Sequence, residues 1–256
     1  MKRATVLTLA MLACLTGPAA MARAEADPPA DPCAVPETVY TVDGTLPRAD
    51  ERLERGGVLP ILVLNSAGSR PDTGYPAVLE KDLAARLPDR KVSVTVRNAP
   101  GATAAEMLPI LSRELAVSSA SLLVWQVGTA DAMRNIGPDS FGEALDRGVA
   151  EAQGHGADVI LMDMQYSPQT TQLITFQPYL DYVEWVSQDS GVLHFPRFEM
   201  MRHWFEDGRV GFAPDSKEEK LQAYQFVHRC LGRMLADTVA TMLERAGPDH
   251  AGRPAQ

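Results

Sequence analysis

The chain has 256 residues, a formal net charge of −9 and 45% hydrophobic residues, which is enough for one sizeable α/β domain with a hydrophobic core. An acidic chain without a basic cluster is a poor candidate for binding nucleic acid or an anionic membrane surface. Beyond the N-terminal segment, no apolar run approaches the length of a membrane span, so we expect no membrane association once that segment is removed.

The N-terminal segment has the pattern of a signal peptide. A positively charged start precedes an apolar core at residues 4–16, and residues 22–24 fit the small-x-small cleavage pattern. We therefore predict a signal peptide at residues 1–24 and a periplasmic or secreted protein. Cleavage removes three basic residues and no acidic one, which changes the net charge from −9 to −12. A lipoprotein modified at Cys14 is the alternative, and the cleavage pattern disfavours it.

An N-terminal arm is predicted at residues 25–57. It contains a short possible strand at residues 38–42 and a short helix at residues 48–55, which two glycines end. The main domain is predicted at residues 58–246. A disordered tail is expected at residues 247–256.

Apolar runs alternate five times with amphipathic segments in the main domain. The predicted strands are residues 60–65, 91–97, 121–127, 159–162 and 192–195. The predicted helices are residues 75–87, 104–116, 139–153, 170–189, 198–205 and 217–246. Capping boxes mark two helix starts, at Thr103 with Glu106 and at Ser216 with Glu219. This alternation predicts a parallel sheet with helices on both faces.

Two cysteines remain after the predicted cleavage, Cys33 and Cys230. An even pair in an exported chain favours one disulfide bond over two free thiols. The chain has no Cys-x-x-Cys motif and no cluster of His and Cys, so we expect neither a metal site nor a cofactor.

Short polar motifs follow several of the predicted strands. They occupy residues 65–69, 98–101, 128–131, 163–168 and 207–208. In order and spacing these motifs resemble those of the SGNH, or GDSL-like, hydrolases, a family of esterases and acyl hydrolases. The resemblance implies a flavodoxin-like three-layer α/β/α sandwich with a five-stranded, mostly parallel sheet. It also implies that the motifs meet at the carboxyl edge of that sheet.

The family pattern has a Ser nucleophile after the first strand, a Gly and an Asn as oxyanion donors, and an Asp-x-x-His pair near the C-terminus. When this chain is aligned without gaps, Ala67 stands at the Ser position, Ala130 at the Asn position and Val210 at the His position. Gly101 and Gly128 are kept, so the oxyanion and cleft positions implied by the resemblance are Ala67, Gly101, Gly128 and Ala130.

Two functional hypotheses follow from these replacements. The first is a catalytically degenerate protein that binds a small molecule or glycan, such as an envelope carbohydrate or an acylated ligand. The second is an active acyl or acetyl esterase that uses a displaced Ser and His. The candidate catalytic residues for it are Ser66, Ser69, His203, His228 and Asp207. A serine hydroxyl within hydrogen-bond reach of an imidazole would favour the esterase. The sequence does not determine the oligomeric state.

Overall fold

The computed structural model describes residues 31–66, 72–212 and 215–246. The chain divides into two units, residues 1–31 and 32–256, and the fold described is that of the second unit. The predicted signal peptide at residues 1–24 and the predicted tail at residues 247–256 lie outside the described residues.

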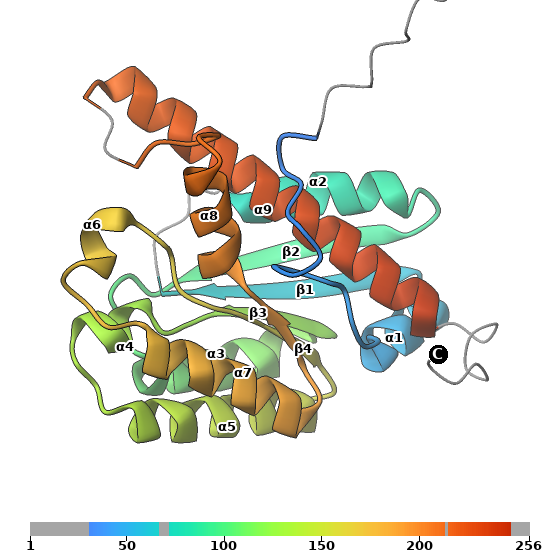
Figure 1. The fold of residues 1–256 in the computed structure, drawn as a ribbon. Coiled ribbons are helices and arrows are strands. Elements are labelled where there is room, and N and C mark those ends of the chain that lie inside the picture. The colour runs from blue at the N-terminus through green and yellow to red at the C-terminus, as the bar shows by residue number, and fades with distance from the viewer. Residues whose placement is uncertain (1–30, 67–71, 213–214, 247–256) are drawn as a thin grey trace, which may run out of the picture. The chain divides into compact units, whose positions relative to one another are not determined.

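Five parallel strands form the centre of the unit, in the spatial order β2-β1-β3-β4-β5 (Figure 1). They are β1 (Val58–Asn65), β2 (Lys91–Asn98), β3 (Leu122–Gln126), β4 (Asp158–Met162) and β5 (Leu193–Phe195). The strands β3 and β4 are buried along their whole length, as expected of continuous apolar runs covered on both faces. The predicted α/β fold class is confirmed, and every strand pairing among the described residues is parallel.

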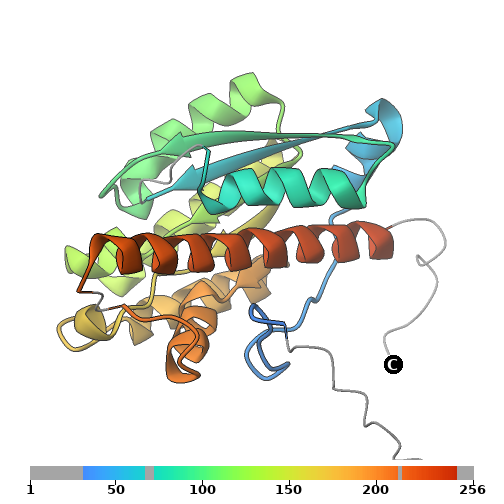
Figure 2. The same cartoon turned by 90° about the horizontal axis from the view of Figure 1, so that it is seen from above.

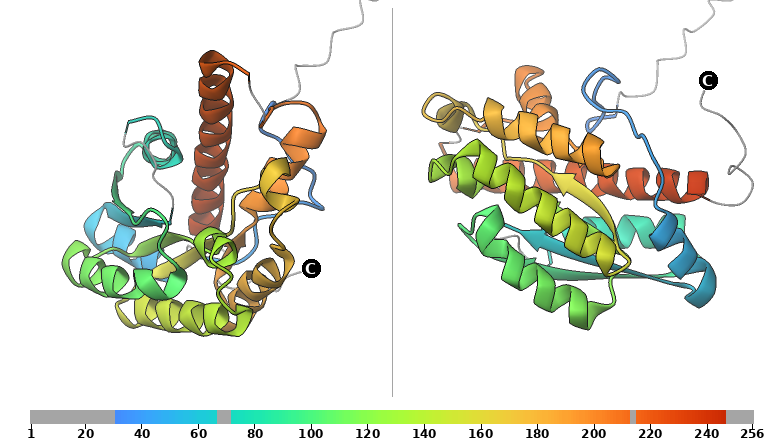
Figure 3. Two further views of the ribbon diagram at one scale, coloured as in Figure 1. Left: turned by 90° about the vertical axis from the view of Figure 1, so that its left-hand side faces the viewer. Right: turned by 90° about the horizontal axis from the view of Figure 1, so that it is seen from below.

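Helices cover both faces of the sheet. On one face lie α2 (Tyr75–Arg86) and α9 (Lys217–Ala246), which run side by side (Figure 2). On the other face lie α3 (Ala104–Ser118), α5 (Pro138–Gly154) and α7 (Gln177–Ser190) (Figure 3). The remaining helices are α1 (Pro47–Gly56), α4 (Thr129–Met133), α6 (Pro168–Thr171) and α8 (Arg197–Glu206). None of the helices within the described ranges is long and apolar enough to cross a membrane.

Local sequence signals set the helix boundaries. Both predicted capping boxes form. At the first, the Glu106 N–H donates to the Thr103 hydroxyl at 3.3 Å, and the Glu106 carboxylate accepts from the Thr103 N–H at 3.0 Å. The predicted helix at residues 170–189 is two helices, α6 and α7, because Pro178 stands in the first turn of α7, where its missing N–H costs nothing.

The predicted strand at residues 38–42 is wrong. The N–H groups of Val39 and Tyr40 both donate to the Pro36 carbonyl, at 2.9 and 3.1 Å, and so form a turn. Tyr40 then packs edge-on against Phe195, and its hydroxyl hydrogen-bonds Thr238 of α9 at 2.7 Å. The side chains of this segment therefore pack against the main domain, and the segment pairs with no strand among the described residues.

The arm is covalently fixed to the main domain. Cys33 and Cys230 form a disulfide bond, which confirms the predicted pair, and their Cα atoms lie 5.1 Å apart. The indole of Trp204 donates to the Cys33 carbonyl at 3.2 Å. Farther along, the Asp158 carboxylate at the start of β4 accepts from the N–H groups of Arg48 and Ala49 in α1, at 2.9 Å each. Both ends of the described arm are thus held against the sheet and α9.

Candidate functional site

The strand order reverses beside β1. The chain passes from β1 to β2 on one side and then returns to β3 on the other. In open α/β sheets, ligands bind outside the carboxyl ends of the strands at such a point. Asn65 and Gln126 are register partners there, and Asn98 lies on the other side of Asn65. The candidate site, named the strand-end site here, consists of Asn65, Ser66, Tyr75, Gln126, Gln165, Arg197 and His228.

Asn65 ties three elements together at this edge. Its side-chain oxygen accepts from the Tyr75 hydroxyl at 2.5 Å, and its amide donates to the Asn98 side chain at 3.2 Å. Tyr75 is the first residue of α2 and is buried, which raises the pKa of its hydroxyl. Asn65 therefore joins β1, β2 and α2 at the position where the hydrolase pattern has a glycine.

Ser66 lies at the end of β1 with a buried hydroxyl. This hydroxyl has no hydrogen-bond partner among the described residues. The carbonyl of Ser66 accepts from the Gly101 N–H at 2.9 Å, so this candidate oxyanion donor is already engaged. The contact that would favour the esterase, a serine hydroxyl on an imidazole, is not formed by Ser66 within the described part of the chain. Ala67 and Ser69 lie outside it.

The residues of the turn after β3 have structural roles. Gly128 has a φ of +87°, and a Cβ atom there would lie 2.9 Å from the Met164 sulfur. Ala130 is buried and brings only a methyl group. Asp131 accepts the Ala104 N–H on both carboxylate oxygens, at 3.0 and 3.2 Å, and burial raises its pKa. The acid of the motif thus anchors the start of α3.

His228 caps a helix. Its Nδ1 accepts from the Tyr75 N–H at 3.0 Å, at the start of α2, where Gly74 offers no capping side chain. Burial, and then the positive charge of Arg197, lowers the pKa of His228 to about 3. A neutral ring that accepts at Nδ1 carries its proton on Nε2. In this state the imidazole has no free lone pair with which to take a proton from a serine.

His203 and Asp207 are brought together, at 3.3 Å between Nε2 and Oδ2, at the end of α8. Asp207 also pairs with Arg209 at 2.7 Å, and Arg209 donates to the Ala34 carbonyl at 2.6 Å. Val210 is buried in the core. Through Arg209, Asp207 links the end of α8 to the arm. Neither His203 nor Asp207 hydrogen-bonds the Ser66 hydroxyl.

Arg197 is a site residue that the sequence analysis missed. It follows β5 by two residues, is 3% exposed, and donates from Nη2 to the Gln165 side chain at 3.0 Å. Its Nε and Nη1 atoms have no hydrogen-bond partner among the described residues, and neither has Gln126 Nε2. The available signal was an arginine set between Pro196 and Phe198 directly after an apolar strand, a position where a charge is seldom solvated.

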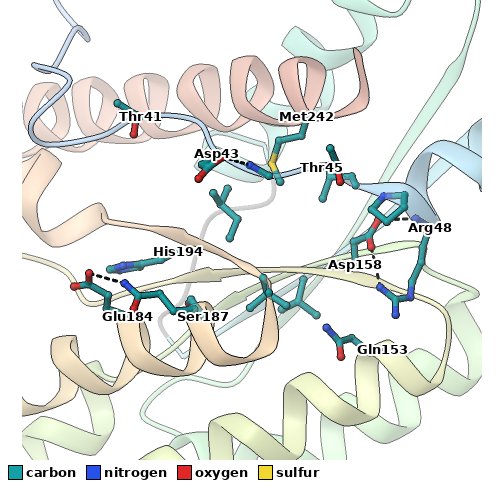
Figure 4. A pocket seen from close by; sticks show the side chains of 18 residues that line it. Thr41, Asp43, Thr45, Arg48, Gln153, Asp158, Glu184, Ser187, His194 and Met242 are labelled. Atoms are coloured by element: carbon teal, nitrogen blue, oxygen red, sulfur yellow. Dashed lines mark hydrogen bonds and ion pairs between the residues drawn. The ribbon is translucent and has the colours of Figure 1, made fainter. Parts of the chain in front are cut away.

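A cavity of about 500 Å³ opens at the opposite edge of the sheet, near the starts of β4 and β5 (Figure 4). Arg48 pairs there with Asp158, while Glu184 and His194 lie at the other end. The His194 ring bonds Asp163 at 2.9 Å, and Asp158 already accepts from Arg48 and Ala49. Because these polar groups are satisfied within the protein, this cavity is the weaker candidate for a binding site.

Metal binding has no support among the described residues, since no three of their His, Cys, Asp and Glu side chains are placed to share an ion. The donors left without partners at the strand-end site are N–H groups and a hydroxyl. Such groups bind anions or polar organic groups rather than cations.

Comparison with known proteins agrees with this fold. The model of the non-GDSL lipase-like family matches residues 32–245. Among solved structures, TesA has a TM-score of 0.53 and 21% identity over 73% of this chain and 99% of its own. A catalytic mutant of Axe2, an acetylxylan esterase from Geobacillus stearothermophilus, has a TM-score of 0.57 and 15% identity over 78% and 96%. No curated protein matches the sequence.

Proposed function

The chain belongs to the non-GDSL lipase-like family, and we propose that it uses the strand-end site to bind a ligand without hydrolysing an ester. The observation that carries the proposal is the state of Ser66, whose buried hydroxyl has no partner in the described part of the chain. A serine hydroxyl is a weak nucleophile until a base takes its proton. The imidazole of His228, one of the candidate bases, accepts from the first residue of α2, and its pKa is lowered to about 3.

The positions for oxyanion stabilisation support the same proposal. The Gly101 N–H bonds the Ser66 carbonyl, and Ala130 offers no side-chain donor. A preorganised donor contributes roughly 3–4 kcal/mol to transition-state stabilisation, so losing two of them removes much of what an acyl-transfer site provides. What the fold retains is a strand-end site with buried polar groups.

A small molecule or glycan, such as an envelope carbohydrate or an acylated ligand, is the proposed ligand. Its support is that the solved structures with this fold include an acetylxylan esterase. A location in the periplasm or outside the cell is also proposed. Its support is the signal-peptide pattern together with the disulfide bond between Cys33 and Cys230, since disulfides persist in oxidising compartments.

An esterase assay tests the proposal. Purified protein without residues 1–24 is incubated with p-nitrophenyl acetate and p-nitrophenyl butyrate, beside a Ser66→Ala/Ser69→Ala double variant. We expect both proteins to give the same background rate. Turnover by the wild-type protein that the double variant lacks would establish the displaced-nucleophile esterase instead.

The assay has an internal control for folding. Because the Ser66 hydroxyl is buried without a described partner, replacing Ser66 with Ala removes no hydrogen bond to a described residue. The free energy of unfolding should therefore stay unchanged or rise slightly. A Ser112→Ala variant, whose hydroxyl bonds the Leu108 carbonyl within α3, serves as the matched serine control for activity.

A further inference from the structure

Arg197 carries a buried charge that forms no direct ion pair with a described carboxylate. Its guanidinium has five N–H donors, and the hydrogen bond described for them goes from Nη2 to Gln165. No described carboxylate forms an ion pair with it. The charge of Asp163 acts on it, but this carboxylate hydrogen-bonds His194 and the Phe198 N–H. An unpaired buried charge is among the most unfavourable features of a protein interior.

The groups around Arg197 add further donors. Trp125 faces α5, where the Gly148 backbone leaves room for it, so the next residue, Gln126, faces α2 and α9. On that same face Asn65, the register partner of Gln126, bonds Tyr75. Gln126 is 2% exposed, and its Nε2 has no hydrogen-bond partner among the described residues.

Tyr75 and His228 place the guanidinium on this face as well. The Arg197 charge helps to lower the pKa of His228, and it acts on the buried hydroxyl of Tyr75. Both of these neighbours are neutral in the folded protein and bonded to other groups, Tyr75 to Asn65 and His228 to the start of α2. Both residues therefore lie near the guanidinium without pairing with its charge.

A route to solvent leads through Gln165. This residue is exposed, yet its side-chain oxygen is the acceptor of Arg197 Nη2. A ligand that supplies a better acceptor can displace an exposed side chain at little cost, because the released carboxamide is solvated. The guanidinium therefore lies one side chain away from the surface.

We propose that Arg197 is the anion-binding residue of the strand-end site and that the ligand of this protein bears a carboxylate. The geometry favours a single negative charge, because one guanidinium charge is unpaired and a dianion would leave excess negative charge in a buried site. The planar donors of arginine also match a carboxylate. This inference rests on the proposed function only in placing the ligand at the strand-end site.

The test measures thermal stability and binding of the protein without residues 1–24 in sodium acetate, sodium glucuronate, sodium phosphate and sodium chloride at equal ionic strength. Acetate and glucuronate should raise the melting temperature of the wild-type protein saturably, and chloride should not. A phosphate response equal to that of acetate would overturn the assignment of a carboxylate. Equal melting temperatures in all four salts would overturn the anion site itself.

Two variants locate the effect. Arg197→Met should weaken acetate binding at least about tenfold, the scale of one charge-assisted hydrogen bond. It should also keep or raise the melting temperature in chloride, because it removes an unpaired buried charge. Gln165→Glu places a carboxylate beside the guanidinium, so it should raise that temperature and abolish the acetate response. If Arg197→Met does not fold, Gln165→Glu decides alone, and an acetate response that persists in it contradicts the proposal.

The matched control is Arg202→Met on the same helix, since Arg202 is half-exposed and paired with Glu199. This variant should keep the full acetate response. The ester assay separates the two proposals. If the protein shows both an acetate response and serine-dependent turnover, only the proposal of a non-hydrolytic function is contradicted. If the protein shows neither an acetate response nor turnover, only the proposal of a carboxylate ligand is contradicted.

Discussion

At the residue scale, polar groups at the carboxyl edge of the sheet divide by whether the protein itself satisfies their hydrogen bonds. Asn65, Asp131 and His228 resemble site residues by their positions, yet each bonds the backbone or a side chain of a neighbouring element. Arg197 and Gln126 have buried donors without described partners. The first set builds the edge of the sheet, and the second set is what a ligand can use.

The titration of His228 gives a residue-scale prediction for stability. Folding lowers its pKa from 6.5 to about 3. The unfolded chain therefore binds more protons between pH 6.5 and about 3, and the free energy of unfolding should fall as pH falls through this window, by at most about 1.4 kcal/mol per pH unit. A His228→Gln variant keeps an acceptor but does not titrate, so it should show a smaller slope.

Urea unfolding of both proteins across this pH window measures the effect. The buried carboxyls of Asp131 and Asp158 have raised pKa values, which act with the opposite sign, but they are present in both proteins and cancel in the difference. Identical pH slopes for the two proteins would show that folding does not lower the pKa of His228.

At the element scale, the contact between α2 and α9 positions both Tyr75 and His228. Gly232 of α9 makes this contact close, because a Cβ atom there would lie 2.5 Å from the Val78 Cβ and 2.6 Å from the Tyr75 carbonyl oxygen. The glycine is thus required for the distance between the helices, and through it for the cap that His228 provides.

Replacing Gly232 tests this packing. Gly232→Ala should lower the free energy of unfolding by about 1–3 kcal/mol, because the helices must separate, although alanine is the better helix former by about 1 kcal/mol. Gly154→Ala is the control, since Gly154, the last residue of α5, has nothing within 4 Å of the added Cβ. Chemical denaturation of both variants gives the comparison. Equal stability of the two would contradict the close contact.

At the scale of the whole molecule, one covalent bond spans most of the chain. The disulfide between Cys33 and Cys230 closes a loop with a sequence separation of 197 residues and joins the arm to the middle of α9. The same arm reaches β4 through the hydrogen bonds of α1 to Asp158. We therefore expect the arm and the main domain to unfold as one unit.

The disulfide yields the prediction at this scale. A Cys33→Ala/Cys230→Ala variant should lose roughly 2–5 kcal/mol of unfolding free energy, because the bond restricts the unfolded chain over a long loop. Thiol titration of the denatured, unreduced protein without residues 1–24 should find no free thiol. One or two titrated thiols per chain would show that the bond does not form in solution.

The sequence by itself determined the alternation of strands and helices, both capping boxes and the disulfide pair. These signals are local, or, for the cysteines, follow from number and compartment. It also indicated the family and the edge of the sheet at which the candidate site lies. The segment at residues 38–42 was misjudged because its apolar pattern packs on Phe195 and α9, which a local pattern does not reveal.

Only the tertiary structure decided what each polar residue does at the strand-end site. His228 follows Tyr75 by more than 150 residues, and its role as a cap exists only because α9 folds back beside α2. Arg197 and Gln126 come from different strand ends and are buried on one face by that same arrangement. Burial and hydrogen-bond partners are properties of groups brought together over long distances in the chain, and they determine which charges are left for a ligand.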